Sequence, residues 1–299
     1  MYTETGYITP TPPFDFTKSL HFLGHFAPMQ REQTLSVHTL TKAIYVEGQI
    51  IVFQLTSTGA IEAPQLEYTL FSEQPIDAFT SNAAIDRITF FLGLADDLEP
   101  LYLIGRTDPN FAPLIEQLYG YHQVKFATPF ESACWAILSQ RNLLTVAQKM
   151  KQALVECFGG SLNVNGTDHW AFPEPTSLAI VSEGELADVI RNVRKGEQLS
   201  TVARAFSEVD EAYLRTATYD EVEAWLLKIK GIGAWSAQFI LLRGLGRTEH
   251  TPLTEKKLLE AASRTYGRGQ EITPEALQRI ADKYSLWQGY WAHYLRVAS

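Results

Sequence analysis

The stretch KIKGIGAWSAQF, residues 228–239, combines two glycines, two lysines and a run of apolar residues. Gly231-Ile232-Gly233 separates two segments with helical spacing, YDEVEAWLLKIK before it and AWSAQFILL after it. The pattern predicts two helices joined by a tight turn. The first backbone N–H groups of the second helix have no partners within the helix and carry partial positive charge, so they suit a phosphate oxygen.

Two interpretations of this turn remain open from the residues alone. Glycine lets an anion approach the main chain closely, and Lys228 and Lys230 would attract a nucleic-acid backbone whatever its base sequence. The same Gly-x-Gly turn also serves as a packing corner between helices, which needs no ligand. We therefore use the sequence around the turn to distinguish the two interpretations.

Basic residues gather around the turn although the chain as a whole is acidic, with a formal net charge of −9. Residues 226–268 contain eight bases, Arg268 included, and three acids; residues 1–105 contain twelve acids and four bases, Arg31 included. This distribution favours a nucleic-acid partner more than the net charge does, although a solvated helical face would produce the same pattern.

The composition is that of a globular protein, with 299 residues, 45% hydrophobic and 20% charged. No apolar run approaches the ~20 residues that span a bilayer, and the N-terminus lacks the basic and apolar regions of a secretory signal. We therefore expect a cytoplasmic protein without a membrane partner. Cys134 and Cys157 are too few for an iron–sulfur cluster, form no zinc pattern and occupy apolar positions, which predicts buried free thiols.

The chain changes character near residue 108. LSVHTL, AIYVEGQIIVFQLTS and QLEYTLF, within residues 35–71, are rich in β-branched and aromatic residues, with Glu47-Gly48 as a hairpin turn, and a helix is expected over residues 80–94. From Pro109 onward the spacing is helical. The prediction is an α+β fold: a mixed α/β domain with an antiparallel sheet (1–108), a helical domain (109–222), and a second helical region with the hairpin (223–299).

The sequence from 226 to 255, LLKIKGIGAWSAQFILLRGLGRTEHTPLTE, resembles the helix-hairpin-helix motif and following loop of the helix-hairpin-helix DNA glycosylase superfamily. Within it, the resemblance is closest to bacterial 3-methyladenine DNA glycosylase II. It extends to PPFDFTKSLHFL (12–23), TPFESACWAILSQRNLLTVAQKM (128–150) and FPEPTSLAIVSEGELADVIRNVRKGEQLSTVARAF (172–206). These segments occur in the family's order and cover nearly the whole chain.

The resemblance implies a set of contacts to double-stranded DNA that contains damaged bases. The hairpin turn would bind a phosphate, and its carbonyls are a candidate site for a monovalent cation, although Ile229-Lys230-Gly231 replaces the family's usual Leu-Pro-Gly. Arg141 falls where relatives place the residue that fills the gap left by an extruded nucleotide. The implied DNA-binding residues are Gln140, Arg141, Lys228, Lys230, Gly231, Gly233, Ala234 and Lys256. The protein is expected to act as a monomer on nucleoid DNA, without a resident metal or other cofactor.

The resemblance also implies an aromatic base pocket. Trp235, Phe239, Phe22 and Tyr290 match pocket positions of the family, and such rings would favour cationic alkylated purines by stacking and cation–π attraction. Trp235 stands where strand-cleaving relatives have a lysine nucleophile, so hydrolysis by water is expected rather than a Schiff base. At the position of a further C-terminal aromatic residue, ungapped alignment places Arg296.

The catalytic carboxylate expected from the resemblance is an aspartate after the loop proline, and Glu255 occupies that position. A carboxylate facing the anomeric carbon stabilises the oxocarbenium-like charge of N-glycosidic cleavage. Glutamate has the same charge on a side chain one methylene longer; it would also suit the first turn of a helix without any catalytic role.

Three functions follow from these residues. The first is a monofunctional glycosylase for alkylated purines, of the 3-methyladenine type, in base excision repair. The second is a catalytically weakened or inactive protein that binds lesions or duplex DNA, because the aspartate is replaced. The third is a glycosylase for oxidised purines, although the absence of a lysine at position 235 disfavours the lyase chemistry usual for that group.

Overall fold

The structure is a computed structural model that describes residues 1–30, 32–267 and 269–298, so Arg31 and Arg268 lie outside the described residues. Within these ranges, five strands form an antiparallel sheet in the order β1-β5-β4-β3-β2. The strands are β1 (Tyr2–Ile8), β2 (Gln33–Leu35), β3 (Thr39–Val46), β4 (Gln49–Ser57) and β5 (Leu66–Ser72). This confirms the predicted N-terminal antiparallel sheet.

The predicted strands differ from the observed ones in two places. The expected hairpin at Glu47 and Gly48 is present, and both residues have positive φ, 51° and 74°, as a two-residue hairpin turn requires. LSVHTL, in contrast, is not a continuous strand, because the Ser36 side chain accepts hydrogen bonds from the backbone N–H groups of His38 and Thr39 and turns the chain between β2 and β3. The edge strand β1 was not anticipated.

The helical part begins with a helix close to the predicted one. Helix α2 (Ala78–Leu92) starts at Asp77, whose side chain accepts from Thr80 N–H, and ends at Gly93 in the left-handed conformation. It is preceded by α1 (Phe16–His25) and the short η1 (Ala27–Met29). The remaining helices are α3 (Glu99–Thr107), α4 (Ala112–Gln117), α5 (Pro129–Ser139), α6 (Leu144–Phe158), α7 (Pro175–Ala179), α8 (Glu183–Ile190), α9 (Val193–Glu208), α10 (Glu211–Thr216), α11 (Tyr219–Lys228), α12 (Ala234–Gly244), α13 (Lys256–Tyr266), α14 (Pro274–Ala281), η2 (Asp282–Trp287) and α15 (Gln288–Val297).

Two details of the helical part correct the sequence predictions. Residues 109–222 are not all helical, because β6 (Gly160–Val164) and β7 (Thr167–Ala171) form a hairpin whose apolar face packs against Ala43 and Val52 of the main sheet. Of the two cysteines, Cys134 is buried as expected, but Cys157 is exposed, because α6 is a surface helix there. Among the described residues, no helix combines the length and apolar character needed to cross a membrane.

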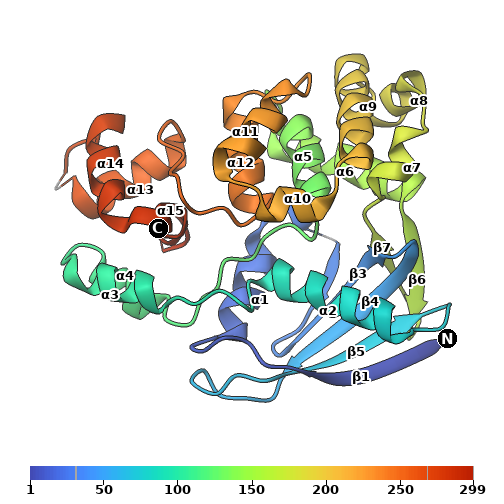
Figure 1. Cartoon of the computed structure of the whole chain (residues 1–299), viewed down its shortest axis with the longest axis horizontal. Helices are drawn as coiled ribbons and strands as arrows, with labels where there is room; N and C mark the ends of the chain where they lie inside the picture. Colours follow the sequence, from blue (N-terminus) through green and yellow to red (C-terminus); the bar gives the residue numbers. More distant parts are fainter. Residues whose placement is uncertain (31, 268, 299) are drawn as a thin grey trace.

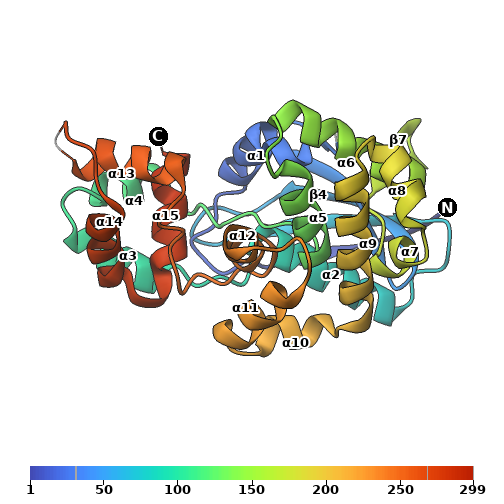
Figure 2. The same ribbon diagram turned by 90° about the horizontal axis from the view of Figure 1, so that it is seen from above.

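The helices divide into two groups around different clusters of buried side chains. One cluster joins the sheet to α5–α12, with Phe53, Trp135 and Leu226 among its members. The other joins residues 98–121 to residues 258–295, with Tyr102 and Trp291 fully buried in it. Figures 1 and 2 both show α3, α4 and α13–α15 gathered at one end of the molecule, away from the N-terminal strand. These clusters include segments from both sides of residues 108 and 222, the boundaries proposed from the sequence.

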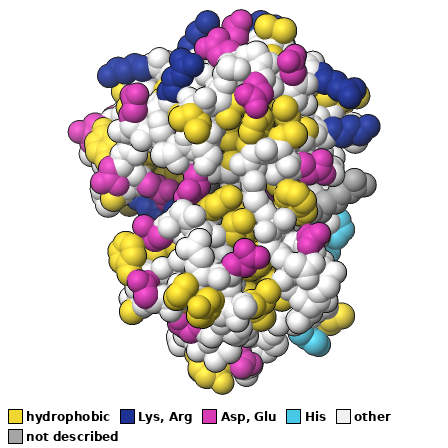
Figure 3. Space-filling view, turned by 90° about the vertical axis from the view of Figure 1, so that its right-hand side faces the viewer, with side chains coloured by type: hydrophobic (Ala, Val, Ile, Leu, Met, Phe, Trp, Pro, Cys, Tyr) yellow, Lys and Arg dark blue, Asp and Glu magenta, His cyan; other side chains and the backbone are white. Residues whose placement is uncertain are grey.

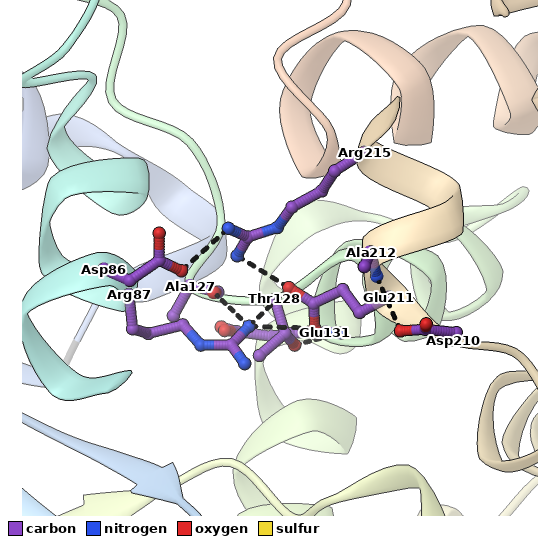
Figure 4. A network of polar contacts seen from close by, with 9 residues as sticks. All are labelled: Asp86, Arg87, Ala127, Thr128, Glu131, Asp210, Glu211, Ala212 and Arg215. Carbon is purple, nitrogen blue, oxygen red and sulfur yellow. Dashed lines mark hydrogen bonds and ion pairs between the residues drawn. The ribbon is translucent and has the colours of Figure 1, made fainter. Parts of the chain in front are cut away.

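Charged side chains connect the first domain to the helices that follow. The Arg87 guanidinium on α2 donates to both carboxylate oxygens of Glu211 on α10, at 2.9 and 3.0 Å, and to the Ala127 carbonyl (Figure 4). Arg215 forms ion pairs with Glu211 at 2.7 Å and with Asp86 at 2.9 Å. This network holds α10 against α2, beside the chain that leads into the hairpin.

Positive and negative side chains are unevenly distributed over one face of the molecule. On the face that carries β6, β7 and α7–α9, Lys and Arg side chains gather at the helical end, whereas the sheet end shows mostly acidic and apolar ones (Figure 3).

Candidate active site

The predicted pair of helices is present as α11 and α12, joined by the turn 229–233. Gly231 has φ +104°, and a Cβ at this position would lie 2.9 Å from the side chain of Gln198 on α9, so only glycine fits. Gly233 precedes the first residue of α12 with φ −99°, and a Cβ there would meet nothing within 4 Å. The open side of the turn is therefore at Gly233, where the unpaired N–H groups of α12 begin.

The segment that was predicted to enter the duplex lies beside this turn. The chain leaves α5 at Ser139, Arg141 is exposed with φ +55°, and α6 begins at Leu144. The Lys195 Nζ donates to the carbonyls of Ile137 and Gln140, at 2.5 and 2.9 Å, and so fixes the end of α5. Gln140, predicted to contact DNA, donates through Nε2 to the Gly231 carbonyl at 2.9 Å and to Ser236 Oγ at 3.1 Å. Through these hydrogen bonds, the Gln140 side chain connects the loop after α5 to the turn between α11 and α12.

These loops enclose a hollow of about 980 Å³, which we call the hairpin hollow. Its lining comprises residues 139–141, 194, 197–198 and 230–236. It thus brings together six residues of the predicted DNA-binding set: Gln140, Arg141, Lys230, Gly231, Gly233 and Ala234. It also includes Arg194, an exposed base on α9 that the sequence predictions missed because it lies far from the hairpin along the chain.

The other predicted DNA contacts lie outside the hairpin hollow. Lys228 is the last residue of α11 and is exposed. Lys256 is also exposed, at the first position of α13, and lies 3.6 Å from Glu260 in an ion pair along that helix. Both positions leave the ammonium groups accessible to a ligand.

A continuous row of aromatic rings leads from the hairpin hollow into the protein. Trp235, which is 45% exposed, stacks on Phe239 with ring centroids 5.5 Å apart. Phe239 contacts Phe126, which contacts Phe26, and Phe26 stacks on Phe22 at 5.0 Å. The structure therefore connects the predicted pocket residues Trp235, Phe239 and Phe22, through two rings that sequence reasoning missed.

At the inner end of this row lies a buried cation. The Arg243 guanidinium is 5.2 Å from the centroid of Phe22 and 4.8 Å from that of Phe26. Its Nη1 donates to His293 Nδ1 at 3.2 Å, so the opposite nitrogen, Nε2, donates to the Tyr121 hydroxyl at 3.0 Å. One face of Phe22 is thus occupied by the protein's own cation, a contact that no local sequence pattern indicated.

The electrostatics of this group follow from its burial. Burial holds the pKa of His293 well below its usual range, and the guanidinium groups of Arg243 and Arg296 act in the same direction, so the imidazole is neutral. Burial also lowers the pKa of Arg243 to about 10, partly opposed by the negative charge of Glu255. Arg243 therefore remains positively charged at neutral pH.

Glu255 lies at the start of α13 and does not point into water. Its carboxylate oxygens are 3.0 and 2.7 Å from Nη1 of Arg296, in the last turn of α15. The side chains of Glu255 and Arg296 are 24% and 20% exposed. Glu255 directly precedes α13, where an acid also suits the helix dipole, and its side chain makes no hydrogen bond to the backbone of that helix.

Tyr290 is the predicted pocket residue that the structure places elsewhere. Its side chain is 2% exposed, and its hydroxyl donates to Asp96 and accepts from the backbone N–H of Gln123. Because the ring packs among Tyr294 and Trp287, it belongs to the second buried cluster rather than to a surface that a base can reach.

The turn was also considered as a site for a monovalent cation. The carbonyl of Ile229 accepts from Ile232 N–H at 3.0 Å, and that of Gly231 accepts from Gln140. Each of these oxygens accepts one hydrogen bond and keeps a second lone pair, so a monovalent cation at the turn stays a prediction.

Comparisons with known proteins show similarity along most of the chain. The chain is 28% identical over 259 residues to the DNA-3-methyladenine glycosylase of Bacillus subtilis, covering 86% of this chain and 84% of that protein. Its structure superimposes on the 3-methyladenine DNA glycosylase of Archaeoglobus fulgidus with a TM-score of 0.80 at 22% identity, over 98% and 97% of the two chains. It superimposes on MBOgg1, in complex with a low-affinity DNA ligand, with a TM-score of 0.74 at 18% identity, over 99% and 98%.

No protein-family model matches the chain. The two structural similarities establish the fold, and the relative from Bacillus subtilis extends the likeness along most of both sequences. Together with the glycine turn between α11 and α12 and the acidic residue that follows it, they make the chain similar to the helix-hairpin-helix DNA glycosylases, and along most of its sequence to a 3-methyladenine enzyme.

Proposed function

We propose that the chain is a monofunctional DNA glycosylase of base excision repair that flips alkylated purines, of the 3-methyladenine type, out of duplex DNA and hydrolyses the N-glycosidic bond. The observation that carries this proposal is the likeness to a DNA-3-methyladenine glycosylase along 86% of the chain, with a carboxylate at the catalytic position. The protein would act as a monomer on nucleoid DNA.

The site supports each step of this reaction. The N–H groups at Gly233 and the ammonium of Lys230 would hold a phosphate, and Arg141 would fill the space of the extruded nucleotide. Trp235, partly exposed and backed by Phe239, offers a face on which the everted base would stack.

The chemical step would belong to Glu255. Its ionised carboxylate would stabilise the positive charge that develops on the sugar while water attacks and the base departs. With Trp235 in place of an amine, that position cannot form a Schiff base, so the strand would stay intact. The reaction needs no cofactor, because a carboxylate and water supply its chemistry.

Neither alternative is favoured by a specific observation. Glu255 is paired with Arg296 and about three-quarters shielded from water, and nothing in the comparisons points to a protein that binds lesions without hydrolysis. The likeness to MBOgg1, at 18% identity, concerns the fold, and position 235 lacks the lysine of a lyase.

The test is release of base from methylated DNA. We expect 3-methyladenine and 7-methylguanine to be released, with strand breaks only after abasic sites are heated or treated with base. Glu255→Gln should lower the single-turnover rate by about a hundredfold or more, because the developing charge loses its counter-charge. Affinity for DNA with an abasic-site mimic should be retained.

Glu271→Gln is the matched control, because Glu271 is an exposed acid in the loop after α13. It should release base at the wild-type rate. Tight binding to the abasic-site mimic by a wild-type protein that releases no base would instead identify a lesion binder.

A further inference from the structure

Two positions at which this chain departs from the family pattern are in direct contact. Glu255 stands where an aspartate is expected, and Arg296 stands where an aromatic residue is expected. In the structure both carboxylate oxygens of Glu255 lie within 3.0 Å of Arg296 Nη1. The two residues are 41 positions apart, so this contact depends on the tertiary fold.

The contact is built into the protein rather than being a loose surface pair. Helices α13 and α15 pack against each other through the second buried cluster, where Leu258, next to the start of α13, and Leu295, beside Arg296, are both fully or almost fully buried. The first turn of α13 and the last turn of α15 are therefore fixed relative to each other. Both partners are about three-quarters shielded from water, which strengthens their attraction relative to an exposed pair.

The extra methylene of glutamate makes the position of its carboxylate less defined than that of aspartate, and the contact with Arg296 restricts it. A longer side chain has one more rotatable bond, and its carboxylate can occupy positions that differ by about 1.5 Å, the length of a carbon–carbon bond. A misplacement of about 1 Å in an active site can cost on the order of a hundredfold in rate. A catalytic glutamate at this position therefore needs a partner that selects one rotamer.

We propose that Arg296 is a positioning residue that holds the Glu255 carboxylate where it faces the sugar, so that the replacement of aspartate is compensated by the arginine that replaces the aromatic residue. This inference rests on the proposed function. It assigns Arg296 a role in the rate of the chemical step and none in binding DNA.

The surrounding charges agree with this assignment. The charge of Arg296 lowers the pKa of the buried Arg243 and that of Glu255 raises it, so two guanidinium groups lie near one carboxylate. The pair of Arg296 with Glu255 leaves the buried Arg243 to the rings of Phe22 and Phe26. In this proposal the Glu255 carboxylate stays negatively charged and faces the sugar, and Arg296 fixes its orientation from the opposite side.

The experiment compares Arg296→Met, which keeps the apolar stem without the charged donor, with Arg296→Lys, which keeps a cation. Single-turnover release of 7-methylguanine from methylated DNA, affinity for an abasic-site mimic and melting temperature are measured for each. Arg296→Met should slow release by about 10- to 100-fold, with affinity within about threefold of wild type. Arg296→Lys should recover most of the rate. Arg279→Ala, an exposed arginine on α14, is the matched control and should behave as wild type.

A second set of variants isolates the dependence on Glu255. In a Glu255→Gln background, Arg296→Met should change the residual rate by less than about twofold, because there is no carboxylate left to orient. Glu255→Asp should also make the protein insensitive to Arg296→Met, because the shorter side chain does not reach the guanidinium. Equal losses in the wild-type and Glu255→Gln backgrounds would overturn the proposal, as would a melting temperature that falls in step with the rate.

The outcomes separate this inference from the proposed function. A wild-type protein that releases methylated bases, with Arg296→Met releasing them equally fast, leaves the glycosylase in place and removes the role of Arg296. A wild-type protein that releases no base removes the glycosylase itself, and with it the reaction that Arg296 would serve.

Discussion

His293 shows how much of the site's chemistry depends on single buried side chains. Its imidazole lies between Arg243 and Tyr121. It accepts a hydrogen bond from the Arg243 guanidinium and donates one to the Tyr121 hydroxyl. Any proton added to its acceptor nitrogen would bring a second positive charge against Arg243 in a buried site. The neutral form is therefore a condition of the folded site.

This arrangement predicts an acid-sensitive stability. The pKa of His293 is depressed in the folded protein, whereas the unfolded chain takes up a proton near pH 6.5. As pH falls below 6.5 the unfolded state binds more protons, so the free energy of unfolding decreases. Between pH 7 and pH 5 the contribution of this one histidine is about 2 kcal/mol.

His293→Gln provides the comparison, because an amide can accept from Arg243 and donate to Tyr121 without titrating. Denaturant unfolding at pH 7 and pH 5 should show a smaller loss of stability for the variant than for wild type. Equal losses for both proteins would mean that His293 is protonated in the folded state.

At the scale of elements, the two glycines of the turn between α11 and α12 differ in what the fold requires of them. Gly231 is required by the fold, because of its positive φ and the Gln198 side chain beneath it. Gly233 has an ordinary backbone conformation and open space around it, so packing within the chain does not require a glycine there.

A pair of alanine substitutions tests this distinction. Gly231→Ala should lower the free energy of unfolding by about 1–3 kcal/mol, because of strain at positive φ and the clash with Gln198. Gly233→Ala should leave the melting temperature nearly unchanged and weaken binding to duplex DNA, because its methyl group lies where a phosphate would approach. A Gly233→Ala protein that binds DNA as tightly as wild type would show that the turn is only a packing corner.

At the scale of the whole molecule, an acidic protein is expected to bind a polyanion through one basic region. Binding of duplex DNA should therefore weaken steeply as salt rises. Lys230→Ala, at the rim of the hairpin hollow, should reduce the slope of log affinity against log salt by about 0.9 and weaken binding to damaged and undamaged duplexes alike. Lys283→Ala, an exposed lysine on η2, should leave the slope unchanged.

The sequence predicted those features whose signals are local. The glycine turn, the Glu47-Gly48 hairpin and the start of α2 each follow from a few neighbouring residues. Glu255 and Trp235 were assigned by the resemblance to the family's hairpin and loop. The edge strand β1 was missed because its alternation is weak and mostly exposed.

The rest depended on contacts between distant segments. Alignment indicated that an aromatic residue was replaced by Arg296, but its reach to Glu255 follows only from the packing of α13 on α15. Tyr290 was assigned to the pocket by its position, while its hydroxyl is used by Asp96 in the core. In the sequence Arg243 is one of the bases of the positive segment 226–268. In the structure it is buried against the rings of Phe22 and Phe26.

The division of the buried clusters has a consequence for synthesis on the ribosome. Leu101 and Phe111 emerge early, yet their partners in the second cluster, such as Leu258 and Trp291, are translated near the end of the chain. The second cluster, which lies beside Glu255 at the start of α13, therefore cannot form until translation is almost complete. A nascent chain that stalls before residue 258 exposes the apolar residues of positions 98–121 to solvent, because their partners are not yet synthesised. Chaperones would have to shield this segment.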